Sequence, residues 1–327
     1  MKTKILHDLE LHRGEYISGQ EFAKSFGVTR AAVWKAVNYL REEGHRIKGL
    51  TNKGYRLENF SDVLSAKGIK SHLKPPSRVK RVICLTKTDS TNNYAKHLAL
   101  NGESHGTLIA ANHQTSGRGR RGHIFESPAG KGLYMSLILR PNTDAEKFQM
   151  ITVADAVAVC LAVEDLYPES RGSLGIKWVN DVYMRGKKIC GILTEALTGF
   201  ESGEIETVIT GIGINVSHCK FPESAGNAGS IFEDDDMIFG RNELCARVAE
   251  YVLKFAENLD DPEIISEYRK RSILTGHEIS YIKGETKSYG HVEGIDDTGG
   301  LVVLNEAGEL ETLRSGEVFM VRSEERS

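Results

Sequence analysis

The chain has 327 residues, of which 40% are hydrophobic and 27% charged, so it is long enough for two or three soluble globular domains. Its net charge of −3 excludes a protein that is basic throughout, but residues 1–60 hold 11 Lys and Arg against 7 Asp and Glu, whereas the remainder holds 31 against 38. A basic first segment on an acidic body is typical of a small nucleic-acid-binding domain attached to a domain with another task.

The cysteines and the apolar runs indicate where the protein works. None of the five cysteines forms a Cys-x-x-Cys pair, which argues against a disulfide framework or a zinc site and favours buried thiols in a reducing compartment. The N-terminus lacks the apolar core of a signal peptide. The most apolar helical run, residues 151–163, contains Asp155 and is too short to cross a bilayer. We therefore expect a cytoplasmic protein with no membrane partner and no metal held by its own side chains.

Residues 1–60 are predicted to form a winged helix-turn-helix domain. A first short helix should end near Gly14, and residues 18–21 have the sequence of a capping box that starts a second helix. Thr29 can cap a third helix, which should end at Gly44. The basic segment 46–57, with a glycine-containing turn, predicts a hairpin behind the two helices, which is the order of a winged helix.

The outward side chains of this domain are candidates for DNA contact. Those on the third helix should reach base edges, whereas Lys48 and the other hairpin cations should meet phosphates. The predicted DNA-binding residues are Thr29, Arg30, Trp34, Lys35, Asn38, Lys53 and Arg56. A helical protein-interaction module with a solvated basic face is the alternative, and the order of helices and hairpin favours DNA binding.

Residues 61–78 are expected to be a linker with one weak helix, and residues 79–272 a domain built around a sheet. The pattern predicts a buried helix over residues 148–166 and helices over 241–259 and 262–270. The predicted strands cover residues 79–85, 106–112, 133–139, 176–183, 186–195 and 207–216. Five short strands with glycine turns between residues 279 and 321 predict a small SH3-like β-barrel over residues 273–327.

Three features of the central domain point to a ligand site. Residues 88–93 place several small polar side chains at a strand-to-helix junction, where a helix cap alone needs only one of them. Residues 117–122 alternate three glycines with three arginines, a cationic segment that cannot pack a core and needs an anionic partner such as a phosphate. Gly211 and Gly213 alternate in a strand, which either exposes backbone to a flat ligand or marks a simple bulge.

Six motifs occur in one order along the chain. They are Asp89-Ser90-Thr91-Asn92, Gln114 with the segment 117–122, Ser127-Pro128, Lys177-Trp178 with Asn180-Asp181, Lys188 with Gly191-Ile192-Leu193, and Gly211 with Gly213 and Asn215. Together they resemble the biotin–protein ligases of the bifunctional type that also repress the biotin operon, and the resemblance covers almost the whole chain. It implies an α+β protein with a winged helix-turn-helix, a mixed-sheet catalytic domain similar to class II synthetases, and a C-terminal SH3-like β-barrel.

The resemblance also implies a reaction. Biotin and ATP, with Mg²⁺, would form biotinoyl-5'-AMP, and biotin would pass to a lysine of a biotin carboxyl carrier protein. The loaded protein would form a homodimer that binds operator DNA. The implied catalytic residues are Lys188, Arg118, Arg120 and Asp181. The implied binding residues for biotin and ATP are Ser90, Thr91, Asn92, Gln114, Gly117, Arg118, Gly119, Arg120, Arg121, Trp178, Lys188, Gly191, Gly211, Gly213 and Asn215.

The roles implied for these residues differ. Lys188 would contact the biotin carboxylate and the α-phosphate, and the loop arginines would close over the ligand. Asp181 would orient or deprotonate the incoming lysine amine. Taken alone, Lys188 is better explained as a solvated turn lysine beside Lys187, and Asp181 could be a turn residue; the ordered set of motifs is what favours a function.

Three positions depart from the family's pattern, and two other functions compete with this reading. Val179 stands where proline is common, His123 where arginine is common and Phe125 where tryptophan is usual. None of the three removes a group with direct chemistry. A biotin-sensing repressor without catalysis is the first alternative, and a lipoate ligase is the second.

Overall fold

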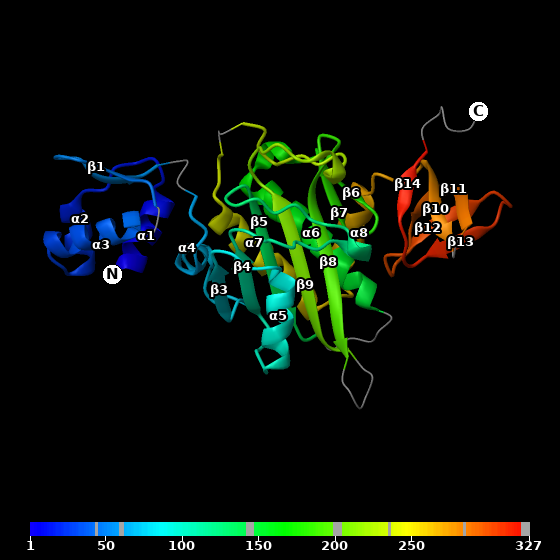
Figure 1. The fold of residues 1–327 in the computed structure, drawn as a ribbon, viewed down its shortest axis with the longest axis horizontal. Coiled ribbons are helices and arrows are strands. Elements are labelled where there is room, and N and C mark those ends of the chain that lie inside the picture. Colours follow the sequence, from blue (N-terminus) through cyan, green and yellow to red (C-terminus); the bar gives the residue numbers. More distant parts are fainter. Residues whose placement is uncertain are drawn as a thin grey trace.

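The computed structural model describes residues 1–42, 45–58, 62–141, 147–198, 205–234, 237–283 and 286–321. Three units lie in a row along the longest axis, with the N-terminal and C-terminal units on opposite sides of a central domain (Figure 1). The predicted boundaries at residues 60, 78 and 272 stay predictions. Within the described ranges, no helix combines the length and the apolar character that crossing a bilayer requires.

The N-terminal unit is the predicted winged helix-turn-helix. Its elements are α1 (Lys2–Leu11), α2 (Gly19–Phe26), α3 (Arg30–Glu42) and the antiparallel hairpin β1 (Ile47–Leu50) and β2 (Gly54–Leu57). The helix starts follow the sequence signals, because Ser18 Oγ accepts from the Glu21 amide at 3.0 Å and Thr29 Oγ1 from the Ala32 amide at 3.2 Å. The predicted end of the third helix at Gly44 lies outside the described residues. Apolar faces of all three helices and the hairpin form a core of their own.

The central domain is built on a seven-stranded mixed sheet with the order β3-β4-β5-β9-β8-β7-β6. The strands are β3 (Arg81–Leu85), β4 (Thr107–Ala111), β5 (Gly132–Leu139), β6 (Leu174–Lys177), β7 (Asp181–Met184), β8 (Lys187–Thr198) and β9 (Ile205–Asn215). β3 and β4 are parallel and the other neighbours are antiparallel. The linker contributes the short helix α4 (Ala66–His72) before β3.

Helices cover the two faces of this sheet unequally (Figure 1). The helices α6 (Phe148–Leu166), α7 (Arg241–Glu257) and α8 (Pro262–Arg271) share one large core with the sheet. The opposite face packs on α5 (Thr91–Leu100) through a small cluster that includes Ile109 and Ile209. Since side chains alternate between faces along a strand, α5 covers only part of its face and leaves the rest for a site.

The prediction of one strand over residues 176–183 is wrong. β6 and β7 form an antiparallel hairpin in which Lys177 pairs with Asp181, and residues 178–180 make the turn. Asn180 stabilises the turn by donating from Nδ2 to the Ile192 carbonyl at 2.9 Å. Trp178 and Val179, in the turn, are apolar and buried like the strand residues before them. The pattern of apolar residues therefore did not show that the chain reverses here.

The C-terminal unit is a five-stranded antiparallel sheet with the order β13-β12-β11-β10-β14. Its strands are β10 (Glu278–Lys283), β11 (Thr286–Ile295), β12 (Leu301–Asn305), β13 (Leu310–Leu313) and β14 (Val318–Met320). The predicted strands are therefore present in the predicted order. Residues of β10, β11, β12 and β14 belong to the same core as the central sheet, so this unit is packed firmly on its neighbour.

Candidate functional site

A cavity of about 410 Å³ opens on the sheet face that α5 leaves uncovered. It brings together segments from the start of α5, the loop between β4 and β5, the β6–β7 turn, β8, β9 and the C-terminal sheet. The predicted residues that line it are Ser90, Thr91, Asn92, Gln114, Arg118, Gly119, Arg120, Arg121, Trp178, Asp181, Lys188, Gly191, Gly211 and Gly213. All four predicted catalytic residues therefore share one cavity.

A hydrogen-bonded network forms one wall of the cavity at the N-terminus of α5. Gln114 Oε1 accepts from the Thr91 amide at 2.8 Å and from Thr91 Oγ1 at 3.1 Å, and Gln114 Nε2 donates to Ser127 Oγ at 2.9 Å. Ser136 Oγ lies 2.8 Å from Thr91 Oγ1 and donates to Asn92 Oδ1 at 2.6 Å. Ser90 occupies the N-cap position, yet its side chain makes no capping hydrogen bond. Helix capping therefore does not explain this set of polar residues, which instead presents a fixed array of donors and acceptors.

Glycines on β8 and β9 form the floor of the cavity. Gly191 and Gly213 are direct partners in the sheet, and a Cβ atom at either would contact the ring of Phe125, at 3.3 Å for Gly191 and 2.5 Å for Gly213. A Cβ at Gly211 would collide with the Asn92 side chain. The alternating glycines thus let the Phe125 and Asn92 side chains lie close to the backbone, whereas close approach by a flat ligand stays a prediction.

The arginine–glycine loop, residues 113–131 between β4 and β5, folds over this floor. Its backbone closes on itself, since Gly119 donates to the His123 carbonyl at 2.7 Å and Phe125 to the Gly117 carbonyl at 3.0 Å. Arg120 Nη1 donates to Asn180 Oδ1 at 3.1 Å, which ties the loop to the β6–β7 turn. On the outer side, Arg118 Nη1 donates to Asn93 Oδ1 at 3.1 Å and lies 3.6 Å from Glu195 Oε1.

Cationic groups converge on the far end of the cavity. Lys188 Nζ lies 2.8 Å from Asp181 Oδ2, and the Lys188 side chain is 32% exposed and that of Asp181 20%. Burial lowers the pKa of the Lys177 ammonium, with the charge of Lys188 adding to this effect and that of Asp181 opposing it. Burial, followed by the charge of Arg121, likewise lowers the pKa of the Arg120 guanidinium. Three partly desolvated cations around one carboxylate make a site suited to anionic oxygens.

The two carboxylate oxygens of Asp181 differ in their partners. Oδ2 pairs with Lys188, whereas the buried Oδ1 has no hydrogen-bond partner among the described residues. Asp181 lines the cavity and its carboxylate has acceptor capacity left, so a rotation of the carboxylate would offer that capacity to an N–H group of a substrate.

Two predicted binding residues do not line the cavity. A Cβ at Gly117 would collide with the Phe125 carbonyl, so this glycine serves loop closure. Asn215 is buried and donates from Nδ2 to the Gly229 carbonyl at 2.9 Å. Both positions support the walls from behind.

Sequence reasoning missed several residues at the site. Lys177 lines the cavity, although the sequence marked it only as part of a motif. Glu195, on β8, accepts a hydrogen bond from Asn92 and forms ion pairs with Lys96 and Arg118. Residues 316–319 of the C-terminal sheet also line the cavity, and the Lys177 ammonium lies 5.3 Å from the centre of the Phe319 ring. No local pattern marks these residues, because the fold brings them in from far along the chain.

The predicted DNA-binding residues fall into two groups. Arg30, Trp34, Lys35 and Lys53 are exposed, and 58% of the large Trp34 side chain is accessible. The other three have partners within the domain, since Thr29 caps α3, Asn38 Oδ1 accepts from Arg41 at 3.0 Å, and Arg56 lies over the Tyr16 ring. The first group is the better candidate for contact with DNA.

No group of three or more His, Cys, Asp or Glu side chains in the described ranges is arranged to hold a metal ion.

Comparisons with known proteins agree with this geometry. The model of the biotin/lipoate A/B protein ligase family matches residues 82–215, a helix-turn-helix domain matches residues 2–56, and the biotin protein ligase C-terminal domain matches residues 276–321. The Escherichia coli bifunctional ligase/repressor BirA is 31% identical over 324 residues, 96% of each chain. The Bacillus subtilis bifunctional ligase/repressor BirA is 41% identical over 204 residues, which span 62% of this chain and 61% of that protein.

Solved structures give the same answer for the central and C-terminal units. The biotin protein ligase from Aquifex aeolicus in complex with biotin and ATP superimposes with a TM-score of 0.57 and 29% identity, over 75% of this chain and all of that one. With the full-length match to the Escherichia coli protein, the chain belongs to the biotin protein ligase family and has the domain content of its bifunctional ligase/repressors.

Proposed function

We propose that this chain is an ATP-dependent biotin–protein ligase that also represses transcription in response to biotin. The observation that carries the proposal is the convergence of Lys188, Asp181 and the loop arginines on one cavity whose other end is the Gln114–Thr91 network. One end of the cavity suits anionic oxygens, and the other suits a polar heterocycle such as the ureido ring of biotin.

In the first step, a carboxylate oxygen of biotin attacks the α-phosphorus of ATP, and pyrophosphate leaves. Negative charge builds on the carboxylate and α-phosphate oxygens, which Lys188 and Arg120 stabilise in surroundings that the loop shields from water. The pair with Asp181 holds the Lys188 ammonium in place while leaving its other hydrogens free to donate.

In the second step, a lysine amine of a carboxyl carrier protein attacks the acyl carbon of biotinoyl-5'-AMP, and AMP leaves. The attacking nitrogen must lose a proton. Asp181 would accept a hydrogen bond from that amine, orient it and take the proton, and the carboxylate oxygen that has no partner among the described residues supports this role.

Mass spectrometry tests the enzymatic part directly. Protein incubated with biotin and MgATP should retain biotinoyl-5'-AMP, and Lys188→Ala should reduce its formation by at least about 100-fold. The exposed neighbour Lys187, which pairs with Glu233 away from the cavity wall, provides a matched control, and Lys187→Ala should leave adenylate formation near wild type. Biotin binding without adenylate formation by the wild type would favour the non-catalytic sensor, and displacement of biotin by lipoate would favour a lipoate ligase.

The repressor part depends on the winged helix and on dimerisation of the loaded protein. Arg30→Ala or Lys35→Ala should weaken binding to operator DNA and leave biotin transfer unchanged, because both side chains lie in a separate unit from the cavity. If either substitution lowered transfer and DNA binding together, the assignment of the two tasks to two units would be wrong.

A further inference from the structure

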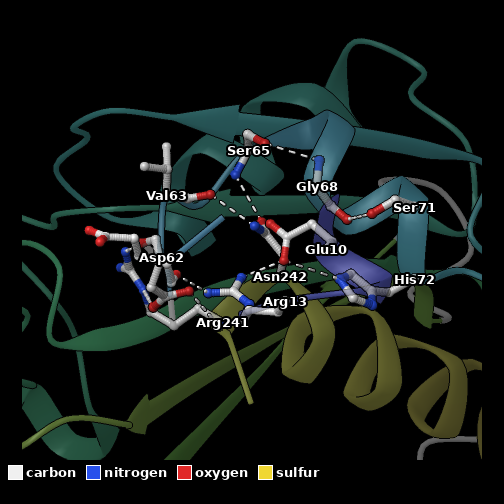
Figure 2. Close-up of polar contacts among 11 residues, drawn as sticks. Glu10, Arg13, Asp62, Val63, Ser65, Gly68, Ser71, His72, Arg241 and Asn242 are labelled. Atoms are coloured by element: carbon white, nitrogen blue, oxygen red, sulfur yellow. Dashed lines mark hydrogen bonds and ion pairs between the residues drawn. The ribbon is translucent and has the colours of Figure 1, made fainter. Parts of the chain in front are cut away.

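A buried polar cluster joins the winged helix to the central domain (Figure 2). Glu10, on α1, is ion-paired with Arg13 and lies 3.9 Å from His72 Nε2 at the end of α4. The Glu10 side chain is 2% exposed and that of His72 11%, so the contact is enclosed. α4 packs in turn between α1 and α7. The winged helix is therefore seated on the linker through charged groups rather than through a shared apolar core.

Arg241, at the start of α7, is the centre of this cluster. The residue is 2% exposed and its guanidinium holds the linker through Asp62: Nε donates to Asp62 Oδ2 at 2.6 Å and Nη2 to the Asp62 carbonyl at 2.6 Å. The Arg241 amide also donates to Asp62 Oδ1 at 2.8 Å. A Cβ at the preceding Gly240 would lie 3.1 Å from Asp62 Oδ1 and 3.3 Å from Arg13 Nη2, so Arg13, in the turn that follows α1, reaches the same point.

The remaining nitrogen of Arg241 points away from the linker. Nη1 donates to Asn112 Oδ1 at 2.9 Å and to the Gly132 carbonyl at 3.1 Å. Asn112 directly follows β4 and Gly132 opens β5, so these are the two stems of the arginine–glycine loop. The stems are themselves joined, because the Gly130 amide donates to the Asn112 carbonyl at 3.3 Å.

The buried guanidinium of Arg241 thus binds both stems of the arginine–glycine loop and also the linker that follows the winged helix. A guanidinium is planar and presents its donors at fixed angles, so its two sides cannot move independently. A shift of the loop stems must either break a buried hydrogen bond or move Asp62. Breaking a buried charged hydrogen bond is unfavourable, and displacement of the linker is the alternative.

We propose that Arg241 is a positioning residue that couples ordering of the arginine–glycine loop around the adenylate to the placement of the winged helix. This inference rests on the function proposed above. Closure of the loop fixes where Asn112 and Gly132 lie. Arg241, which is bonded to both, then moves Asp62 with them. The cluster of Glu10, Arg13 and His72 in turn moves α1. Coupling is reciprocal, so bound DNA must tighten the binding of the adenylate by the same factor by which the adenylate tightens DNA binding.

Two substitutions cut the link on opposite sides of Arg241. Asp62→Asn weakens the linker side, and Asn112→Ala removes a contact on the loop side. The probe is a labelled duplex selected from a random library by wild-type protein loaded with biotin and ATP. The quantity measured is the ratio of the duplex Kd without biotin and ATP to the Kd with both, at one protein concentration and after mass spectrometry has verified retained adenylate.

Asn242→Ala is the matched control. Asn242 also holds the linker, since its side chain accepts from the Ser65 amide at 2.9 Å and donates to the Val63 carbonyl at 2.8 Å. Within the part of the chain that the structure describes, its side chain makes no hydrogen bond to the loop stems. Ratios in allosteric proteins are typically about 5 to 150. We expect the ratio to fall to within about twofold of one in Asp62→Asn and in Asn112→Ala, and to stay near wild type in Asn242→Ala.

The outcomes separate the inference from the function on which it rests. A wild type that forms no adenylate, or that selects no duplex, defeats the proposed function. Adenylate-loaded variants that keep the wild-type ratio overturn the role of Arg241, as does an equal loss in Asn242→Ala, which would indicate general loosening of the linker. If Asp62→Asn lowers the Tm too far for measurement, Asn112→Ala alone decides, and its expected companion effect is loss of the DNA-dependent tightening of adenylate binding.

Discussion

Asp155 is a carboxyl group enclosed in the core of the central domain. It lies on α6, is 1% exposed, and accepts a hydrogen bond from Thr210 on β9. Burial raises the pKa of Asp155 to about 7, although the hydrogen bond from Thr210 opposes the shift. The folded protein therefore keeps this group protonated at pH values where the unfolded chain ionises it.

The sign and size of the effect follow from linkage. Between the ordinary pKa of about 3.8 and the folded value of about 7, the folded state binds more protons, so stability falls as pH rises and levels off above pH 7. The full shift corresponds to about 4 kcal/mol, of which about 3 kcal/mol falls between pH 5 and pH 8.

Asp155→Asn should remove this loss, because the amide stays neutral and its oxygen still accepts from Thr210. Relative to wild type, the variant should gain up to about 3 kcal/mol in free energy of unfolding between pH 5 and pH 8. Urea unfolding in a Trp34→Phe background would follow the central domain, because Trp178 is then the single tryptophan. Glu169→Gln, at an exposed position, should show no such gain. A difference between Asp155→Asn and wild type that is the same at both pH values would refute the reasoning.

Two further predictions concern the cavity and the core. Gly213→Ala places a Cβ 2.5 Å from the Phe125 ring and should raise the KM for biotin by about tenfold. Gly294→Ala, whose Cβ meets nothing within 4 Å, should leave the KM unchanged. Equal KM values for the two variants would contradict this account of the packing. Arg271→Met leaves the buried Glu164 carboxylate without its partner at 2.7 Å and should cost about 3 to 5 kcal/mol in urea unfolding. Lys270→Met, at a side chain 71% exposed, should cost less than about 1 kcal/mol, and a similar loss in both variants would count against a buried pair.

The winged helix was predictable because its signals are local. Ser18 and Thr29 cap the helices that they were expected to cap, and the hairpin forms within the predicted segment 46–57, with its turn at residues 51–53 and Gly54 at the start of β2. Caps and turns depend on residues three or four positions apart, which a single sequence displays.

The cavity was predictable in part. The ordered motifs identified residues such as Lys188, Asp181 and Gln114, and the structure places them together. The sequence did not reveal that residues 178–180 reverse the chain, since the apolar run of β6 continues through Trp178 and Val179 into the turn. Arg241 reads as an ordinary charged residue at a helix start, and only tertiary packing makes it a buried centre of hydrogen bonds.

The two outer units differ in how they are joined to the centre. The winged helix has its own core and meets the rest through polar groups, whereas the C-terminal sheet shares the central core and supplies residues 316–319 to the cavity wall. Recombination could add or delete the first unit without leaving an unfilled core behind. The last unit cannot be exchanged so freely, because its removal would expose apolar surface and open the cavity at once. A ligase of this fold is thus free to gain or lose gene regulation during evolution while its catalytic half stays whole.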